Sequence, residues 1–81
     1  MQSMSLTKLD RTQVGDREQV AQILRAARRA ADLTQREVAR RLDVSDVLIS
    51  QRENAHVSTS APALADQLLV CGYRLIVEPA K

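Results

Sequence analysis

Two helix-start signals close together, at Thr34 and Ser45, constrain the fold of this 81-residue chain more than any other feature. A Thr or Ser ahead of an apolar periodic segment accepts hydrogen bonds from the first amide groups of a helix. Glu37, three residues after Thr34, completes the spacing of a capping box. The pattern therefore predicts two short helices, over 34–42 and 45–54, joined by a tight turn.

A helix is also expected before this pair. Asp16 is its predicted N-cap, with Gln19 at the capping-box spacing. Apolar residues recur at steps of three and four, which is typical of a helix with one buried face. These positions are Val20, Ile23, Leu24, Ala27 and Ala31. Arg25 and Arg29 fall on the opposite, outward face of this predicted helix.

A further helix is expected after the pair. Ser60 is its predicted N-cap, Pro62 is tolerated in its first turn, and Gly72 is well placed to end it. Its predicted apolar face consists of Ala61, Leu64, Ala65, Leu68 and Cys71.

The period changes in the segment 73–78, which is rich in strand-forming residues and is stopped by Pro79. A single strand has no ladder partner, and unpaired backbone groups are costly. It can pair with the N-terminal arm or with its own copy in a second subunit, and we favour the second arrangement. The residues expected at this interface are Tyr73, Leu75, Ile76 and Val77. The expected organisation is an arm over 1–15, a helical domain over 16–72, and a dimerisation strand and tail over 73–81.

Positive charge is concentrated in the middle of the chain. Residues 25–52 hold seven arginines against four acids, whereas the rest holds five basic and six acidic side chains. This distribution is expected for a partner that carries phosphates, and it is equally compatible with a solvated helix face.

Other residue types limit the compartment and the chemistry. A lone Cys71 forms no internal disulfide, no apolar run reaches the length of a membrane span, and no signal-peptide core is present, so we expect a cytoplasmic protein. The sequence has one histidine, and it lacks paired carboxylates in an apolar setting, a glycine-rich phosphate loop and a metal-ligand spacing. We therefore expect that the chain is not an enzyme and has no cofactor.

The stretch TQREVARRLDVSDVLISQREN, over 34–54, resembles the helix-turn-helix of the Cro/phage-repressor (Xre) superfamily. The matching slots are Leu33-Thr34-Gln35, Glu37-Val38-Ala39, Leu42-Asp43, Ser45, Ile49-Ser50 and Glu53. The resemblance extends back to Arg28 and forward to about Leu68. It implies a mainly α, four- to five-helix domain that binds a double-stranded DNA operator, and the C-terminal strand inferred above is expected to pair across a homodimer.

The same resemblance implies which side chains contact DNA. Base reading is expected from Asp46, Val47 and Gln51, with Leu48 and Arg52 at the edge, and phosphate contacts from Ser50 and Asn54. A Gln side chain can form two hydrogen bonds with adenine, Val or Leu can contact a thymine methyl group, and Asp can accept a hydrogen bond from a cytosine amino group. The full set of expected contacts is Thr34, Gln35, Arg36, Ser45, Asp46, Val47, Leu48, Ser50, Gln51, Arg52 and Asn54.

Arg28 and Glu53 occupy slots that form an ion pair in this superfamily, linking the first helix to the end of the third. The chain also departs from the usual pattern. Asp43 stands where the turn normally has a glycine with positive φ, and Arg52 stands at a usually apolar slot. Downstream of the third helix, where basic residues are common, the chain has Ala55, His56 and Ser58.

A helix followed by the strand-like segment 73–78 is similar to the ending of the Hip-type antitoxins. This resemblance implies a repressor of its own operon that also binds a toxin with a kinase-like fold. Two alternatives stay open: a phage or mobile-element Cro-like repressor without a toxin partner, and a protein-interaction module that has lost DNA binding. The first alternative differs from the antitoxin in having no toxin partner. The second alternative predicts no salt-dependent binding to duplex DNA.

Overall fold

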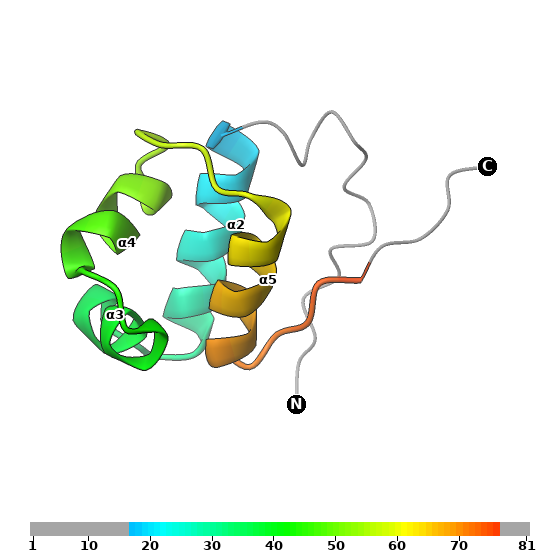
Figure 1. Ribbon diagram of the computed structural model, residues 1–81. Helices are drawn as coiled ribbons and strands as arrows, with labels where there is room; N and C mark the ends of the chain where they lie inside the picture. The colour runs from blue at the N-terminus through cyan, green and yellow to red at the C-terminus, as the bar shows by residue number, and fades with distance from the viewer. Residues whose placement is uncertain (1–16, 77–81) are drawn as a thin grey trace.

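The computed structural model describes residues 17–76, and within this range the chain forms four helices. They are α2 (Arg17–Ala30), α3 (Gln35–Leu42), α4 (Asp46–Glu53) and α5 (Ala61–Val70). Figure 1 shows α2 beside α5, with α3 and α4 grouped together on the left of the view. The mainly helical fold class is confirmed for these residues, which contain no strand.

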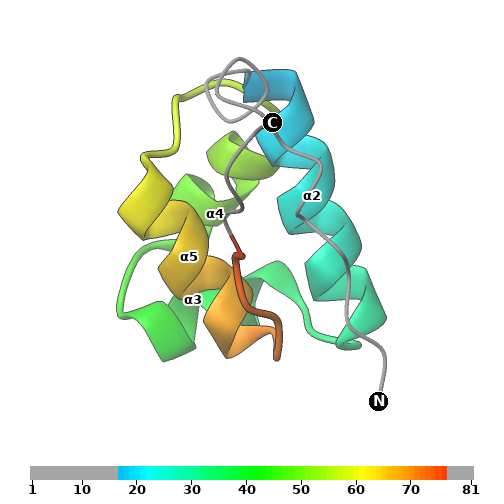
Figure 2. The same ribbon diagram turned by 90° about the vertical axis from the view of Figure 1, so that its right-hand side faces the viewer.

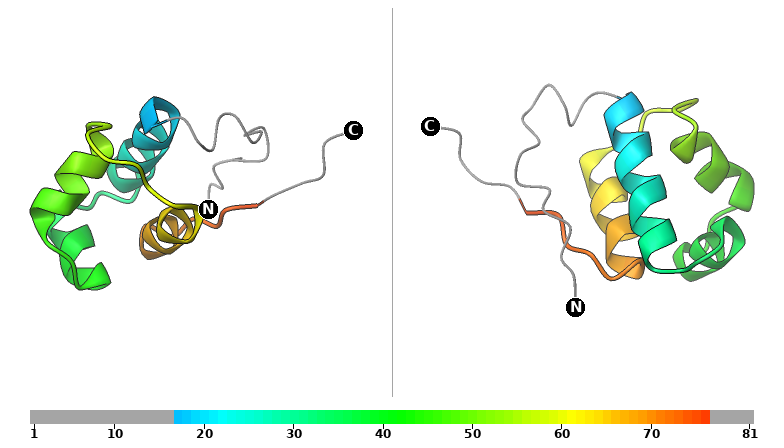
Figure 3. Two further views of the ribbon diagram at one scale, coloured as in Figure 1. Left: turned by 45° about the horizontal axis from the view of Figure 1, so that its top comes forward. Right: turned by 180° about the vertical axis from the view of Figure 1, so that it is seen from behind.

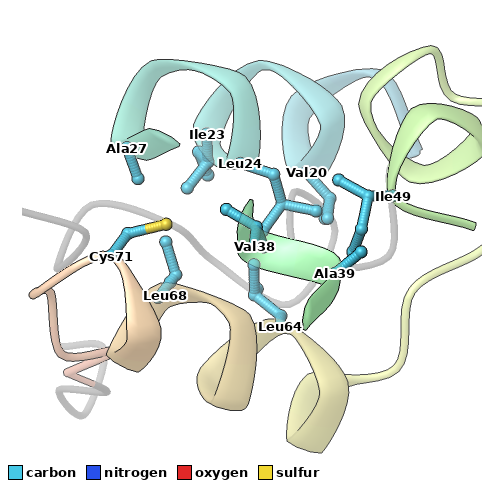
Figure 4. Close-up of a cluster of buried hydrophobic side chains, with 10 residues drawn as sticks. All are labelled: Val20, Ile23, Leu24, Ala27, Val38, Ala39, Ile49, Leu64, Leu68 and Cys71. Carbon is cyan, nitrogen blue, oxygen red and sulfur yellow. The ribbon is translucent and has the colours of Figure 1, made fainter. Parts of the chain in front are cut away.

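All four helices contribute to one apolar core, whose side chains point toward one another between α2, α3 and α5 in Figure 4. Its buried members are Val20, Ile23, Leu24, Ala27, Val38, Ala39, Ile49, Leu64, Leu68 and Cys71. The predicted stripe of α2 is confirmed, apart from Ala31, which is only partly buried. The prediction that Ala61 belongs to the apolar face of α5 is wrong, because this first residue of the helix is exposed. The buried positions of α5 include Gln67 instead.

The predicted helix starts at Thr34, Ser45 and Ser60 are confirmed. The Thr34 hydroxyl accepts from the Glu37 amide at 3.0 Å, and the Thr34 amide donates to Glu37 Oε1 at 2.8 Å, so the capping box is complete. The Ser45 and Ser60 hydroxyls accept from amides three residues further along. The predicted cap at Asp16 lies outside the described residues.

The four helices end in the same way. Each is followed by a residue with positive φ: Asp32 (58°), Asp43 (58°), Ala55 (59°) and Gly72 (87°). The amide after each of these residues donates to a carbonyl five residues back, as in the bonds Leu33 to Arg28, Val44 to Ala39, His56 to Gln51 and Tyr73 to Leu68. These are Schellman turns, which favour glycine at the left-handed position. Only the last of the four has it, so the other three turns are strained.

The segment 73–76 follows α5 without regular secondary structure, and Tyr73 and Leu75 pack against the core while Ile76 is exposed. It leaves α5 on the side away from α3 and α4, as both panels of Figure 3 show. Figure 2 looks onto this side and shows the segment beside α5, nearer the viewer. The predicted pairing of 73–78 with a second subunit needs a second chain and stays a prediction. Val77 and Glu78, like the predicted arm over 1–15, lie outside the described residues.

Candidate nucleic-acid interface

Helix α4 presents a polar outer face to solvent. Asp46, Val47 and Asn54 are exposed, and Ser50 and Gln51 are half-buried. We call these five residues the α4 face. Val47 is 61% exposed and is the only large apolar residue of α4 that is exposed, since Leu48 is half-buried and Ile49 is in the core. An exposed apolar side chain among polar ones suits a surface that contacts a partner with both apolar and polar groups.

The C-terminal end of α4 is fixed to α2 by a buried ion pair between Arg28 and Glu53. Arg28 Nε donates to Glu53 Oε2 at 2.7 Å and Nη2 donates to Oε1 at 3.0 Å, a bidentate geometry. The remaining nitrogen, Nη1, donates to the Leu33 carbonyl at 2.9 Å. Glu53 is 1% exposed, and its hydrogen bonds raise the pKa of Arg28 above its ordinary value, so the guanidinium stays charged. The structure thus brings these two residues together at the base of the α4 face.

Arg25 adds a second connection between α2 and α4 that the sequence did not predict. Its Nη1 donates to the Glu53 carbonyl at 2.7 Å. The expectation that Arg25 lies on the outward face of α2 is therefore wrong. A cation at a helix C-terminus is favourable because the last carbonyls of a helix carry partial negative charge. Together, Arg25 and Arg28 hold the backbone and the side chain of the same α4 residue.

Gln35 and Arg52, both expected DNA contacts, are hydrogen-bonded to side chains on other helices of the protein. Gln35 Nε2 donates to Glu53 Oε1 at 3.2 Å, which joins α3 to the same buried carboxylate. Arg52 Nη1 donates to Gln67 Oε1 on α5 at 3.0 Å. Arg52 is half-buried on the flank of α4 that faces α5. Gln67 is 1% exposed, and its Nε2 has no hydrogen-bond partner.

Other expected contacts serve the local structure. The Thr34 and Ser45 hydroxyls cap α3 and α4, as described above. Asn54 Nδ2 donates to the Ser50 carbonyl at 2.9 Å and to the Ser50 hydroxyl at 3.2 Å, which orients both side chains at the end of the α4 face.

A looser ion pair lies at the other end of the face, where α3 and α4 begin. Arg36 Nε and Asp46 Oδ2 are 4.0 Å apart, and their side chains are 78% and 50% exposed. Two open surface hollows adjoin this pair, one bordered also by Arg40 and Ser45, the other by Thr34 and Gln35. Arg36 and Arg40 are exposed one helical turn apart on α3, so they place positive charge beside the α4 face.

The described residues show few signs of other chemistry. Within 17–76, no group of three or more His, Cys, Asp or Glu side chains is placed to hold a metal ion. Burial raises the pKa of the Cys71 thiol, so the reactive thiolate form is disfavoured. None of the helices in this range has the length and apolar character needed to cross a membrane.

The arrangement of α3 and α4, joined by a turn at Asp43 and held from behind by α2, is the geometry of a helix-turn-helix. A family model described as a helix-turn-helix domain matches residues 19–73, well over half of the 81-residue chain. No curated protein and no solved structure matches the chain. The match supports a regulator that binds DNA. The chain belongs to the helix-turn-helix domain family.

Proposed function

We propose that this protein is a transcriptional repressor, without enzymatic activity, that binds an inverted-repeat operator as a homodimer. The observation that carries the proposal is the α4 face, which stays open to solvent while the buried Arg28–Glu53 pair fixes α4 from behind. A rigid helix with an open polar face suits insertion into the major groove, which is wide enough to admit one helix.

Within this proposal, Gln51 and Val47 read bases. Gln51 has an amide that suits the paired donor and acceptor of adenine, and Val47 offers an exposed apolar surface to a thymine methyl group. Arg36 and Arg40 supply charge for phosphates beside the groove. Arg52 contributes indirectly, because its hydrogen bond to Gln67 joins α4 to α5.

The homodimer is supported by the exposed side chains next to the C-terminal segment. Leu69 on α5 is 64% exposed, Ile76 is 49% exposed, and the segment lies on the side of the molecule away from α4. A second copy at this side leaves both α4 faces free. In a two-fold dimer, such helices enter successive major grooves about one helical turn apart, roughly 34 Å.

Selection from a pool of random duplexes, followed by affinity measurements over a range of salt concentrations, tests this function. We expect an inverted repeat to be enriched and the affinity to fall steeply as salt rises, because phosphate contacts release counterions. Absence of any salt-dependent duplex binding favours the interaction module instead. For the dimer, truncation after Gly72 is expected to weaken self-association in sedimentation experiments, and a tight dimer of the truncated chain contradicts the role of the strand.

We further propose that the repressor is an antitoxin that regulates its own operon and binds a kinase-like toxin in the cytoplasm. The support for this finer role is the sequence pattern alone, a helix followed by the segment 73–78 whose residue types favour a strand. Co-expression with the neighbouring gene tests it: a toxic product that co-purifies with this protein supports the antitoxin, and repression of a phage lysogeny promoter without such a partner favours the phage-type repressor.

A further inference from the structure

Gln67 is a buried polar residue of α5 whose hydrogen-bonding groups are only partly satisfied. It is 1% exposed, and its Oε1 accepts a hydrogen bond from Arg52 Nη1 at 3.0 Å, whereas its Nε2 has no partner among the described residues. Burying an amide donor without a partner costs stability, and a leucine of similar size has no such cost. The stability of the core therefore gives no reason for an amide at this position.

The hydrogen bond to Arg52 is the link between α5 and α4. Helix α4 packs against α2 and α3, and its contact with α5 is sparse. Within residues 17–76, no other hydrogen bond joins a residue of α4 to a residue of α5. The α2 side of α4, by contrast, is held by Arg25 and Arg28 through Glu53. The orientation of α4 relative to α5 therefore depends strongly on this one bond.

The other side of α5 is the side where the second copy is proposed to bind. Leu69, two residues after Gln67, is 64% exposed. Residues two positions apart point to roughly opposite sides of a helix, because each residue turns the helix by about 100°. Figure 1 and both panels of Figure 3 show α5 between α4 and the segment 73–76. Helix α5 thus connects the proposed dimer side to the α4 face.

In a two-fold dimer, the placement of α4 on α5 determines which operators both α4 faces reach at once. Each base pair added between two half-sites separates them by about 3.4 Å and rotates one against the other by about 34°. A dimer whose two α4 helices are held rigidly fits one spacing, whereas a dimer whose α4 helices can tilt adapts to several.

We propose that Gln67 is a positioning residue that, through Arg52, fixes α4 on α5 and thereby sets the half-site spacing that the protein accepts. The inference rests on the DNA-binding homodimer proposed above and adds to it the residue that determines its spacing specificity. In this role the buried amide contributes to a unique arrangement of helices and not to stability, as some buried polar groups do in other proteins.

The test uses the operator that the full-length wild type selects and a series of duplexes in which one or two base pairs are inserted or deleted at its centre. The affinity of the wild type is expected to fall by about 10-fold or more for a change of one base pair, and that of Gln67→Leu by less than about 3-fold. The ratio of affinities is the informative quantity, because a variant that only binds DNA more weakly keeps the wild-type ratio. Gln22→Leu, the same change at an exposed site on α2, is the matched control and should also keep it.

The double variant Arg52→Leu/Gln67→Leu separates positioning from stability. It removes the link and leaves neither polar group unsatisfied, so its urea denaturation midpoint should be close to that of the wild type. It is expected to accept altered spacings as readily as Gln67→Leu does. A wild-type ratio in either variant overturns this inference alone. A wild type that binds all spacings equally, or binds no duplex, overturns the proposed dimeric function as well.

Discussion

Arg28 and Glu53 form a two-bond fork, at 2.7 and 3.0 Å, between the last turn of α2 and the last residue of α4. The same carboxylate accepts from Gln35 at 3.2 Å, so a single buried side chain connects α2, α3 and α4. The position of the α4 face relative to the rest of the domain therefore depends on Glu53.

Glu53→Gln is expected to destabilise the protein by about 3 kcal/mol, because it leaves the Arg28 charge without its carboxylate partner. Urea denaturation measures this loss. Asp66→Asn, an exposed change on α5, serves as the control and is expected to alter stability by less than about 0.5 kcal/mol. A loss below about 1 kcal/mol for Glu53→Gln contradicts the importance of the fork.

Arg52 and Gln67 are expected to show strong coupling in stability. Arg52→Leu or Gln67→Leu alone leaves a polar partner unsatisfied and is expected to cost about 1–3 kcal/mol. The double variant removes both polar groups, together with the unpartnered Gln67 Nε2, and is expected to be close to the wild type. A double-mutant cycle by urea denaturation checks this, and simple additivity of the two losses argues against the contact.

The capping box makes the stability of α3 depend on pH. Hydrogen bonds from the Thr34 backbone and hydroxyl hold the pKa of Glu37 below its ordinary value. A carboxyl group with a lowered pKa in the folded state stabilises above its unfolded pKa, and this contribution disappears as the pH falls through the folded pKa. Wild-type stability should therefore fall more than that of Glu37→Gln between about pH 5 and pH 3. Thermal melts of both proteins across this range test the difference, and parallel curves are the contrary result.

Ala55 should be improved by glycine, although it is part of an ordered turn. Its φ of 59° is strained for a residue with a Cβ atom, so Ala55→Gly is expected to stabilise by about 0.5–1 kcal/mol. The matched control is Ala26→Gly at an exposed site within α2, where the same change should destabilise by about 1 kcal/mol. Loss of stability in both variants speaks against strain at Ala55.

Local signals in the sequence were sufficient to predict where α3, α4 and α5 begin. Thr34, Ser45 and Ser60 each bind amides within their own next turn, so neighbouring residues determine the outcome. The helix ends were harder to predict. Gly72 was recognisable, whereas Ala55 adopts the left-handed conformation against its own preference, because the turn into the next segment requires it.

The supports of the α4 face were predictable only in part. The pairing of Arg28 with Glu53 followed from the resemblance to a known superfamily. Periodicity assigned Arg25 to the solvent-exposed face of α2. A helical repeat gives only the direction in which a side chain leaves the backbone, and it takes no account of how far a long side chain reaches. Gln67 and the direction of Arg52 depend on how α5 packs against α4, which no local pattern encodes.

The affinity of Gln51→Ala for the operator that the wild type selects tests the central claim, that the α4 face reads DNA, most directly. We predict a loss of about 1–3 kcal/mol together with a relaxed preference at one base position. Gln22→Ala, at an exposed site on α2, is the matched control and should bind as the wild type does. Equal affinity and equal base preference for Gln51→Ala and the wild type would contradict the assignment of α4 as the reading helix.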